Sequence, residues 1–280
     1  MKTKNIFTIL LIFILSISLS GVDSHSAKRK RRRRRRRRHF TIGDNIMPRH
    51  KSGIKLAKKF LRGIYLHVNT GRSVRKMRRL IARAKKAHIN CMVIDVAPYR
   101  SMRPVINPKT VKMCIDAGIY PIARIVAFQY GLKTRHVTRA HINAIYRLVD
   151  LSVKAGFKEI QLDYIRFADG WRGASLRWKY NFIAELLHKV KNRINNPDIP
   201  LATDVFGRIV YNRGDVIGQQ LEYMSKYADV ICPMVYPSHY YPDYYKLRHP
   251  YFTVRQSTIK GLNRVGSHTY IMPYIQAFYM

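Results

Sequence analysis

Hydrophobic runs alternate with longer amphipathic segments from residue 61 to the end of the chain. Short apolar runs rich in β-branched and aromatic residues predict seven strands, at residues 63–69, 91–98, 120–128, 159–167, 200–207, 228–237 and 270–278. Apolar residues spaced three or four apart predict helices between them, at residues 73–88, 108–117, 138–155, 175–194, 215–227 and 253–262. Because almost continuously apolar strands alternate with helices, we expect a parallel sheet covered by helices.

Polar residues gather near the C-terminal ends of these predicted strands. They are Asn69, Asp95, Asp163 with Arg166, Asp204, and Tyr236 with His239. A TIM barrel builds its active site at those ends, whereas no glycine-rich nucleotide-binding loop follows any strand. The pattern therefore predicts an α/β fold of the (β/α)8 TIM-barrel type. It is incomplete, because the eighth unit is missing at the C-terminus and would leave an open sheet edge. A truncated chain, a barrel completed by another chain in an oligomer, and a degenerate relative are the three explanations.

The first 61 residues differ in character from the rest. Lys2 and Lys4 precede an apolar run at residues 6–19 that is shorter than the roughly 20 residues of a spanning helix. This pattern predicts a signal peptide over residues 1–20 and a secreted or periplasmic protein. The uninterrupted Lys and Arg of residues 28–38 resist translocation, so an uncleaved membrane anchor is the alternative. Residues 21–61 are predicted to be a disordered basic arm, and residues 62–280 the barrel domain.

Charge suggests partners but does not identify them. The chain has 53 Lys and Arg against 15 Asp and Glu, a formal net charge of +38. A hydrophobic content of 47% is enough for a core, which excludes disorder throughout. We expect the polyarginine tract to bind polyanions such as acidic polysaccharide, anionic lipid or nucleic acid. A specific nucleic-acid partner is disfavoured, because no nucleic-acid-binding module is recognisable.

Several motifs at the predicted strand ends resemble one known family. In order, they are RGIYLHVN, VIDV, ARIV, GFKEIQLDYIRFADG, ATDVFG, IGQQLE and PMVYPSHY. In this order and spacing, residues 62–240 resemble the secreted putative glycosyl hydrolase family that is catalogued as a domain of unknown function. The resemblance implies a barrel like that of α-amylases and a polysaccharide substrate.

Glycoside hydrolysis normally needs two carboxyl groups, one protonated and one ionised. No glutamate falls at the C-terminal end of a predicted strand. Asp163 and Asp204, on adjacent strands at comparable depth, are therefore the predicted catalytic pair. The structural alternatives are that Asp163 forms an ion pair with Arg166 or Arg124, and that Asp204 caps a turn.

Further polar residues are predicted to bind the substrate around this pair. They are Asp95, Arg124, Arg166, Tyr236 and His239. His67 is expected on the first strand, lining the barrel, and Asp169 in a turn. Neither a metal site nor a cofactor is predicted, because the 11 histidines do not cluster at ligand spacing.

The last predicted strand departs from the family pattern. Family members carry Gln-Asp-Phe where this chain has Gln276, Ala277 and Phe278. If the missing carboxylate were the nucleophile, its loss would abolish catalysis. Three hypotheses therefore remain, namely a glycoside hydrolase acting on an anionic, cell-surface or extracellular polysaccharide, an inactive barrel that binds such a polymer, and a basic nucleic-acid-binding protein.

Overall fold

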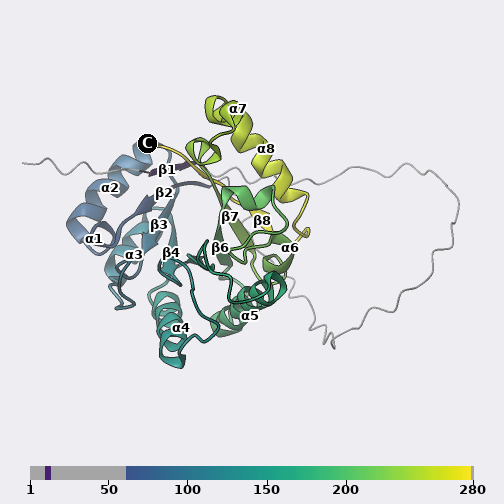
Figure 1. Cartoon of the computed structure of the whole chain (residues 1–280). Helices are drawn as coiled ribbons and strands as arrows, with labels where there is room; N and C mark the ends of the chain where they lie inside the picture. The colour runs from purple at the N-terminus through teal and green to yellow at the C-terminus, as the bar shows by residue number, and fades with distance from the viewer. Residues whose placement is uncertain (1–9, 14–60, 279–280) are drawn as a thin grey trace, which may run out of the picture.

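The computed structural model describes residues 10–13 and 61–278, which form one curled sheet with helices on its outer side (Figure 1). Seven strand positions run parallel in chain order. The strands are β2 (Arg62–Leu66), β3 (Cys91–Asp95), β4 (Tyr120–Val126), β5 (Glu159–Asp163), β6 (Leu201–Phe206) and β7 (Val230–Val235), followed by the short β8 (Tyr270–Ile271) and β9 (Tyr274–Ile275). This is an incomplete (β/α) TIM barrel, which confirms the predicted fold class.

Helices follow the strands and pack against the outer face of the sheet. The main helices are α2 (Val74–Lys86), α3 (Pro108–Asp116), α4 (Arg139–Lys154), α5 (Leu176–Ile194) and α8 (Pro250–Leu262), with shorter turns α1 (Val68–Gly71), α6 (Leu221–Met224) and α7 (Tyr244–Arg248). Ser73, Thr138 and Ser175 cap α2, α4 and α5 by accepting a backbone N–H with the side-chain oxygen. Local sequence therefore sets where the long helices begin.

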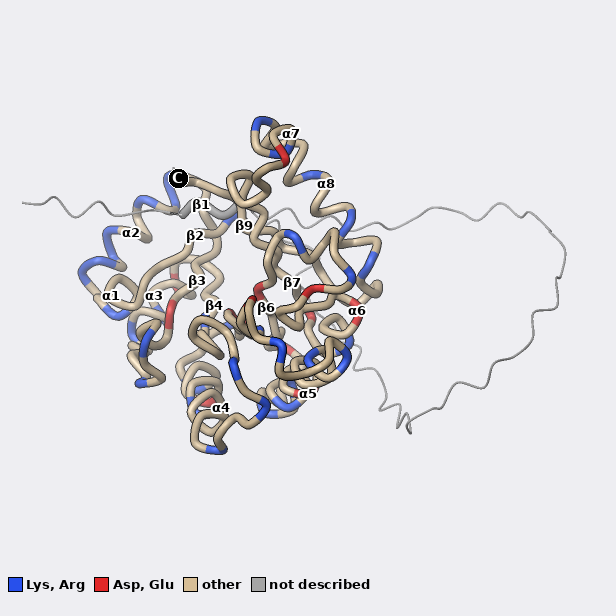
Figure 2. Tube along the Cα trace, in the orientation of Figure 1, with Lys and Arg blue, Asp and Glu red and all other residues tan. Residues whose placement is uncertain are grey.

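Two hydrophobic clusters hold the fold together. The larger cluster lies between the sheet and the helices, and includes Met77, Leu148, Ile160 and Leu187. The smaller one fills the barrel interior and includes Cys91 and Cys232, so these cysteines pack as small apolar residues, as does Cys114 in the larger cluster. Lys and Arg lie mainly on the outer helices, for example along α2 (Figure 2).

Several predicted elements were wrong in extent. The strands predicted at residues 91–98 and 159–167 end at Asp95 and Asp163. The first strand ends at Leu66, because His67 caps α1 and is exposed instead of lining the barrel. The expected helix at residues 215–227 shrinks to Leu221–Met224. The last strand divides into β8 and β9 around Pro273, which has no N–H to donate to the sheet.

The N-terminal predictions fall mostly outside the described residues. The signal peptide of residues 1–20 and the polyarginine arm of residues 21–61 lie outside them, except for β1 (Leu10–Phe13) and Leu61. β1 pairs antiparallel with β2 and also contacts β9. Among the described residues, no helix combines the length and the apolar character that crossing a membrane requires.

Glu159 is buried inside the barrel at the start of β5, the end opposite the aspartates. Its side chain is fully buried, and neither carboxyl oxygen has a hydrogen-bond partner. Burial raises the pKa of Glu159 to about 8, against a smaller opposing influence of the nearby Tyr120 hydroxyl. Glu159 is therefore protonated in the folded protein at neutral pH.

This burial makes stability depend on pH. Since the folded state holds the Glu159 proton more tightly than the unfolded state, stability is greatest below the ordinary pKa of 4.5 and declines as pH rises toward about 8. Across this pH range Glu159 should lower the free energy of unfolding of the wild type by on the order of 4 kcal/mol, and we expect this decline to be absent from Glu159→Gln. Urea unfolding at pH 5 and pH 8 measures it, with the exposed Glu185→Gln as control. Asp204 acts in the same direction, so the slope should fall without vanishing. An unchanged slope in Glu159→Gln would contradict the assignment.

Candidate functional site

The guanidinium of Arg124 joins three carboxyl groups at the C-terminal end of the barrel. Its Nη1 lies 2.5 Å from Asp95 Oδ1, and its Nη2 forms an ion pair with Asp163. Its Nε lies 3.8 Å from Asp204 Oδ2. All four side chains are largely buried, with 13% of Arg124 exposed and less of each aspartate. Arg124 therefore fixes the relative positions of the three carboxyl groups.

Strand register explains why these residues meet. Asp95 is paired with Arg124 across β3 and β4, so a carboxylate and a guanidinium lie side by side. Leu162 is paired with Thr203 across β5 and β6, which places the following residues, Asp163 and Asp204, next to each other. Alternate residues of a strand share a face, so the inward position of Asp163 also directs Gln161 inward.

Asp163 has the surroundings of an ionised carboxylate. Besides the ion pair with Arg124, its Oδ1 accepts a 2.5 Å hydrogen bond from the backbone N–H of Tyr164. Both partners are donors, and a charged carboxylate accepts such bonds most strongly. Asp163 is thus arranged to carry negative charge inside the barrel.

Asp204 lies in a contrasting environment. Burial raises its pKa well above the ordinary range, and the neighbouring Asp163 charge adds to this effect, while Arg124 opposes it. The amide Nε2 of Gln161 donates to Asp204 Oδ1 at 2.8 Å. The hydroxyl of Tyr274 donates in turn to Gln161 Oε1, which fixes the orientation of that amide. Asp204 is therefore suited to hold a proton at neutral pH.

A cavity of about 300 Å³ opens onto this pair. Its lining includes six of the predicted site residues, namely Arg124, Asp163, Arg166, Asp204, Tyr236 and His239. Arg166 reaches the cavity because β5 ends at Asp163, so strict alternation no longer applies. Asp95 is not among the lining residues; it binds Arg124 and accepts a hydrogen bond from the Tyr65 hydroxyl at 2.5 Å.

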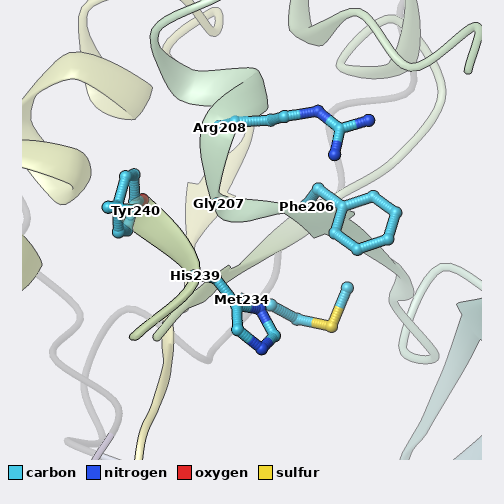
Figure 3. Close-up of a pocket in the computed structure, with 6 residues that line it drawn as sticks. All are labelled: Phe206, Gly207, Arg208, Met234, His239 and Tyr240. Atoms are coloured by element: carbon cyan, nitrogen blue, oxygen red, sulfur yellow. The ribbon is translucent and has the colours of Figure 1, made fainter. Parts of the chain in front are cut away.

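A second cavity has a volume of about 280 Å³. Figure 3 shows the six residues that line it. The two cavities share Phe206, Met234 and His239 as lining residues. Arg208 lies over the ring of Phe206 at 4.8 Å, and Arg166 lies 4.9 Å from the same ring. Asp169, expected only in a turn, forms ion pairs with both arginines. The adjoining cavities make a continuous polar and aromatic surface.

Sequence reasoning missed six residues of the main cavity. They are Tyr65, Tyr164, Phe206, Gln219, Met234 and Tyr274. Gln219 binds the backbone of Phe206 and Asp204, and so holds the end of β6. The IGQQLE motif contains this glutamine but carries no local sign of that role. Only the contacts across the barrel reveal it.

The departure from the family pattern, at the last strand, lies outside both cavities. Ala277 is exposed and lines neither cavity. Gln276 instead accepts hydrogen bonds from the backbone N–H and the hydroxyl of Ser238, at 3.1 and 2.9 Å. From this part of the chain, Tyr274 is connected to Asp204 through Gln161, to which its hydroxyl donates.

Comparison with known proteins agrees with this barrel. Residues 146–280 match the model of a family described as a putative glycosyl hydrolase domain, which confirms the predicted resemblance for this part of the chain. No curated protein sequence matches the chain.

Several solved structures share this fold. The glycoside hydrolase domain of PgaB (BpsB) from Bordetella bronchiseptica is 14% identical, with 72% of this chain and 82% of that chain covered and a TM-score of 0.54. The spore cortex-lytic enzyme SleL of Bacillus cereus is 14% identical, with 75% and 49% covered and a TM-score of 0.50. The C-terminal domain of a putative chitinase from Desulfitobacterium hafniense is 12% identical, with 72% and 63% covered and a TM-score of 0.50. At these identities the likeness concerns the fold.

Proposed function

We propose that this protein is a glycoside hydrolase that cleaves a polysaccharide, with Asp204 as the proton donor and Asp163 as the ionised carboxylate. One observation carries the proposal: two neighbouring carboxyl groups that line one cavity have opposite environments. Donors surround Asp163, whereas burial raises the pKa of Asp204. Glycosidases use such a contrast, because one carboxyl group protonates the leaving oxygen while the other attacks the sugar or activates water.

The remaining residues of the site have supporting roles in this proposal. Arg124 holds the Asp163 carboxylate in place through their ion pair. Gln161 orients Asp204 by donating to its Oδ1. Tyr236 and His239 line the same cavity and offer hydrogen-bonding groups to sugar hydroxyls. Burial lowers the pKa of His239, so we assign it a neutral ring that binds and not a cationic one.

The shape of the site favours a polymer as substrate. Two adjoining cavities of about 300 and 280 Å³ share part of their lining, which suits neighbouring sugar units of one chain. The large excess of Lys and Arg over Asp and Glu favours an acidic polymer. We place such a substrate outside the cytoplasm, in keeping with the secretion signal expected at residues 1–20.

A hydrolysis screen tests this function. Purified full-length protein is incubated with polygalacturonate, alginate and hyaluronan, and with neutral xylan and dextran, and new reducing ends are measured. We expect release from an acidic polymer, decreasing with added salt as electrostatic attraction is screened. An Asp163→Asn preparation made in parallel controls for contaminating hydrolases. Equal release by both preparations would contradict the proposal.

An inactive barrel that binds polysaccharide is the second candidate. It is favoured by the Arg124 guanidinium, which lies against all three carboxyl groups and offsets their charge. Binding of a polymer without release of reducing ends from any of the five substrates would support this candidate and overturn the first.

A further inference from the structure

Three tyrosines form a group beside the candidate active site, at the ends of three successive strands. Tyr99 follows β3, Tyr130 follows β4 and Tyr164 follows β5. The rings of Tyr99 and Tyr130 meet edge to face with centroids 5.5 Å apart, and those of Tyr99 and Tyr164 lie 5.2 Å apart. We call these three residues the tyrosine platform. It extends outward from the cavity, because Tyr164 is one of the cavity-lining residues.

Two of the three tyrosines have a backbone conformation that is rare for residues with a side chain. The φ angles of Tyr130 and Tyr164 are 60° and 52°, in the left-handed region. A bulky residue is strained there, and such strain persists only where the surrounding structure imposes it. Because two members of one aromatic group have this strained conformation, we infer that the strain is retained to keep their rings in position.

The strain at Tyr164 connects the platform to the proposed chemistry. In this conformation the Tyr164 N–H points back to the carboxylate of Asp163 and donates the 2.5 Å hydrogen bond. The same residue lines the cavity, and its ring lies 5.5 Å from the guanidinium carbon of Arg166, another cavity-lining residue. A sugar that contacts this ring is therefore held at a fixed position relative to Asp163.

Tyr130 is held in place by the loop that follows it. Gly131 also has a positive φ, and a Cβ there would lie 2.7 Å from the backbone N of Ala168. The next residue, Leu132, exchanges two backbone hydrogen bonds with the loop after β5, to Arg166 O and from Ala168 N at 3.0 and 2.9 Å. The β4 loop is thus fixed to the β5 loop, while 56% of Tyr130 stays exposed. The backbone that carries the Tyr130 ring is therefore held in place, while the ring is open to solvent.

We propose that the tyrosine platform is a sugar-binding subsite that stacks one pyranose ring of the polysaccharide just beyond the cavity. This inference rests on the proposed function for the identity of its ligand. The C–H face of a pyranose is apolar, and burying it against an ordered aromatic ring is favourable. Tyr130 provides the exposed ring, Tyr99 supports it edge-on, and Tyr164 continues the surface toward Asp163. The platform therefore selects oligomers long enough to reach from the cavity to Tyr130.

Substitution of Tyr130 tests the platform. Tyr130→Gly removes the ring and suits the left-handed backbone, so the fold is retained. Tyr130→Phe keeps the ring, and Tyr251→Ala, at a tyrosine 80% exposed on α8, is the matched control. Binding to disaccharides and decasaccharides of hyaluronan, polygalacturonate and alginate is measured by calorimetry with the full-length variants. We expect Tyr130→Gly to weaken decasaccharide binding about fivefold to tenfold, without affecting the disaccharide. Tyr130→Phe and Tyr251→Ala should match the wild type.

The outcomes separate the platform from the enzyme proposal. Decasaccharide binding that depends on the Tyr130 ring, in a protein that hydrolyses nothing, would support the platform and overturn the hydrolase. Hydrolysis with unchanged affinity in Tyr130→Gly would overturn the platform alone. The platform would also be overturned if Tyr130→Gly lost the same affinity for the disaccharide as for the decasaccharide. The same conclusion would follow if the wild type bound none of the oligomers of the three polysaccharides.

Discussion

Asp163→Asn is expected to reduce hydrolysis of the best polysaccharide substrate by at least about a thousandfold while leaving the fold and sugar binding intact. The change is nearly isosteric, and it removes the negative charge that Arg124 and the Tyr164 N–H hold in place. Asp204→Asn should lower turnover by roughly 100-fold to 10,000-fold, because an amide cannot donate the proton. Initial rates of reducing-end release measure both effects.

The pH profile distinguishes the two roles. In the wild type, turnover should fall as pH rises through the elevated pKa of Asp204, because the donor then loses its proton. That alkaline decline should be absent from the residual activity of Asp204→Asn. Asp116→Asn, an exposed carboxylate on α3, is the control and should behave as the wild type. Wild-type activity in both Asp163→Asn and Asp204→Asn would exclude these residues as the catalytic pair.

Arg124→Met should destabilise the fold strongly, by about 3 to 5 kcal/mol near neutral pH. The methionine keeps much of the side-chain volume but leaves Asp95, Asp163 and Asp204 without the cation that lies against all three. The loss should shrink at acidic pH, where the carboxyl groups take up protons and no longer repel one another. Urea unfolding at pH 4 and pH 7 measures both the size and the pH dependence of the effect.

Arg193→Met offers a matched comparison for this substitution. Arg193 also makes two hydrogen bonds to one carboxylate, that of Asp150, at 2.8 and 2.6 Å. That pair is about half exposed, so its loss should destabilise the fold far less than Arg124→Met does. Similar costs for the two arginines would mean that the Arg124 cluster does not depend on its buried charge balance.

Periodicity predicted the fold because burial on both faces leaves a strong signal in each strand. β3 and β5 are both buried at every position. β3 is apolar up to Asp95, whereas in β5 the inward-facing Glu159, Gln161 and Asp163 alternate with the apolar Ile160 and Leu162. Hydrophobic periodicity mispredicts an element where side-chain hydrogen bonds to the backbone or to a neighbouring residue determine the local structure. His67 ends a strand by capping α1, and Asp215 binds Arg208 and the Ile217 N–H where a helix was expected to begin.

The part of the site that the sequence predicts is the set of polar residues near the C-terminal ends of the strands. Asp163 and Asp204 occupy equivalent ends of adjacent strands, and this can be read from the sequence. The contact between Arg124 and all three carboxyl groups depends on the register of four strands, which no local pattern specifies. Tyr130 lies in a loop whose left-handed backbone has no signature other than the following Gly131. Such residues are found only when the strands are assembled.

Strand order has a consequence for how the chain acquires its structure during synthesis. From β2 to β8, each strand pairs with the strand that follows it in sequence, so every new βα unit finds a partner that already exists. Domains form from the N-terminus as the chain is made, and pairing with the preceding strand requires less loop closure than pairing with a strand farther away in the sequence. We therefore expect the sheet to grow vectorially. The carboxyl cluster, which needs β3 to β6, assembles once Asp204 is made, before the last strands complete the fold.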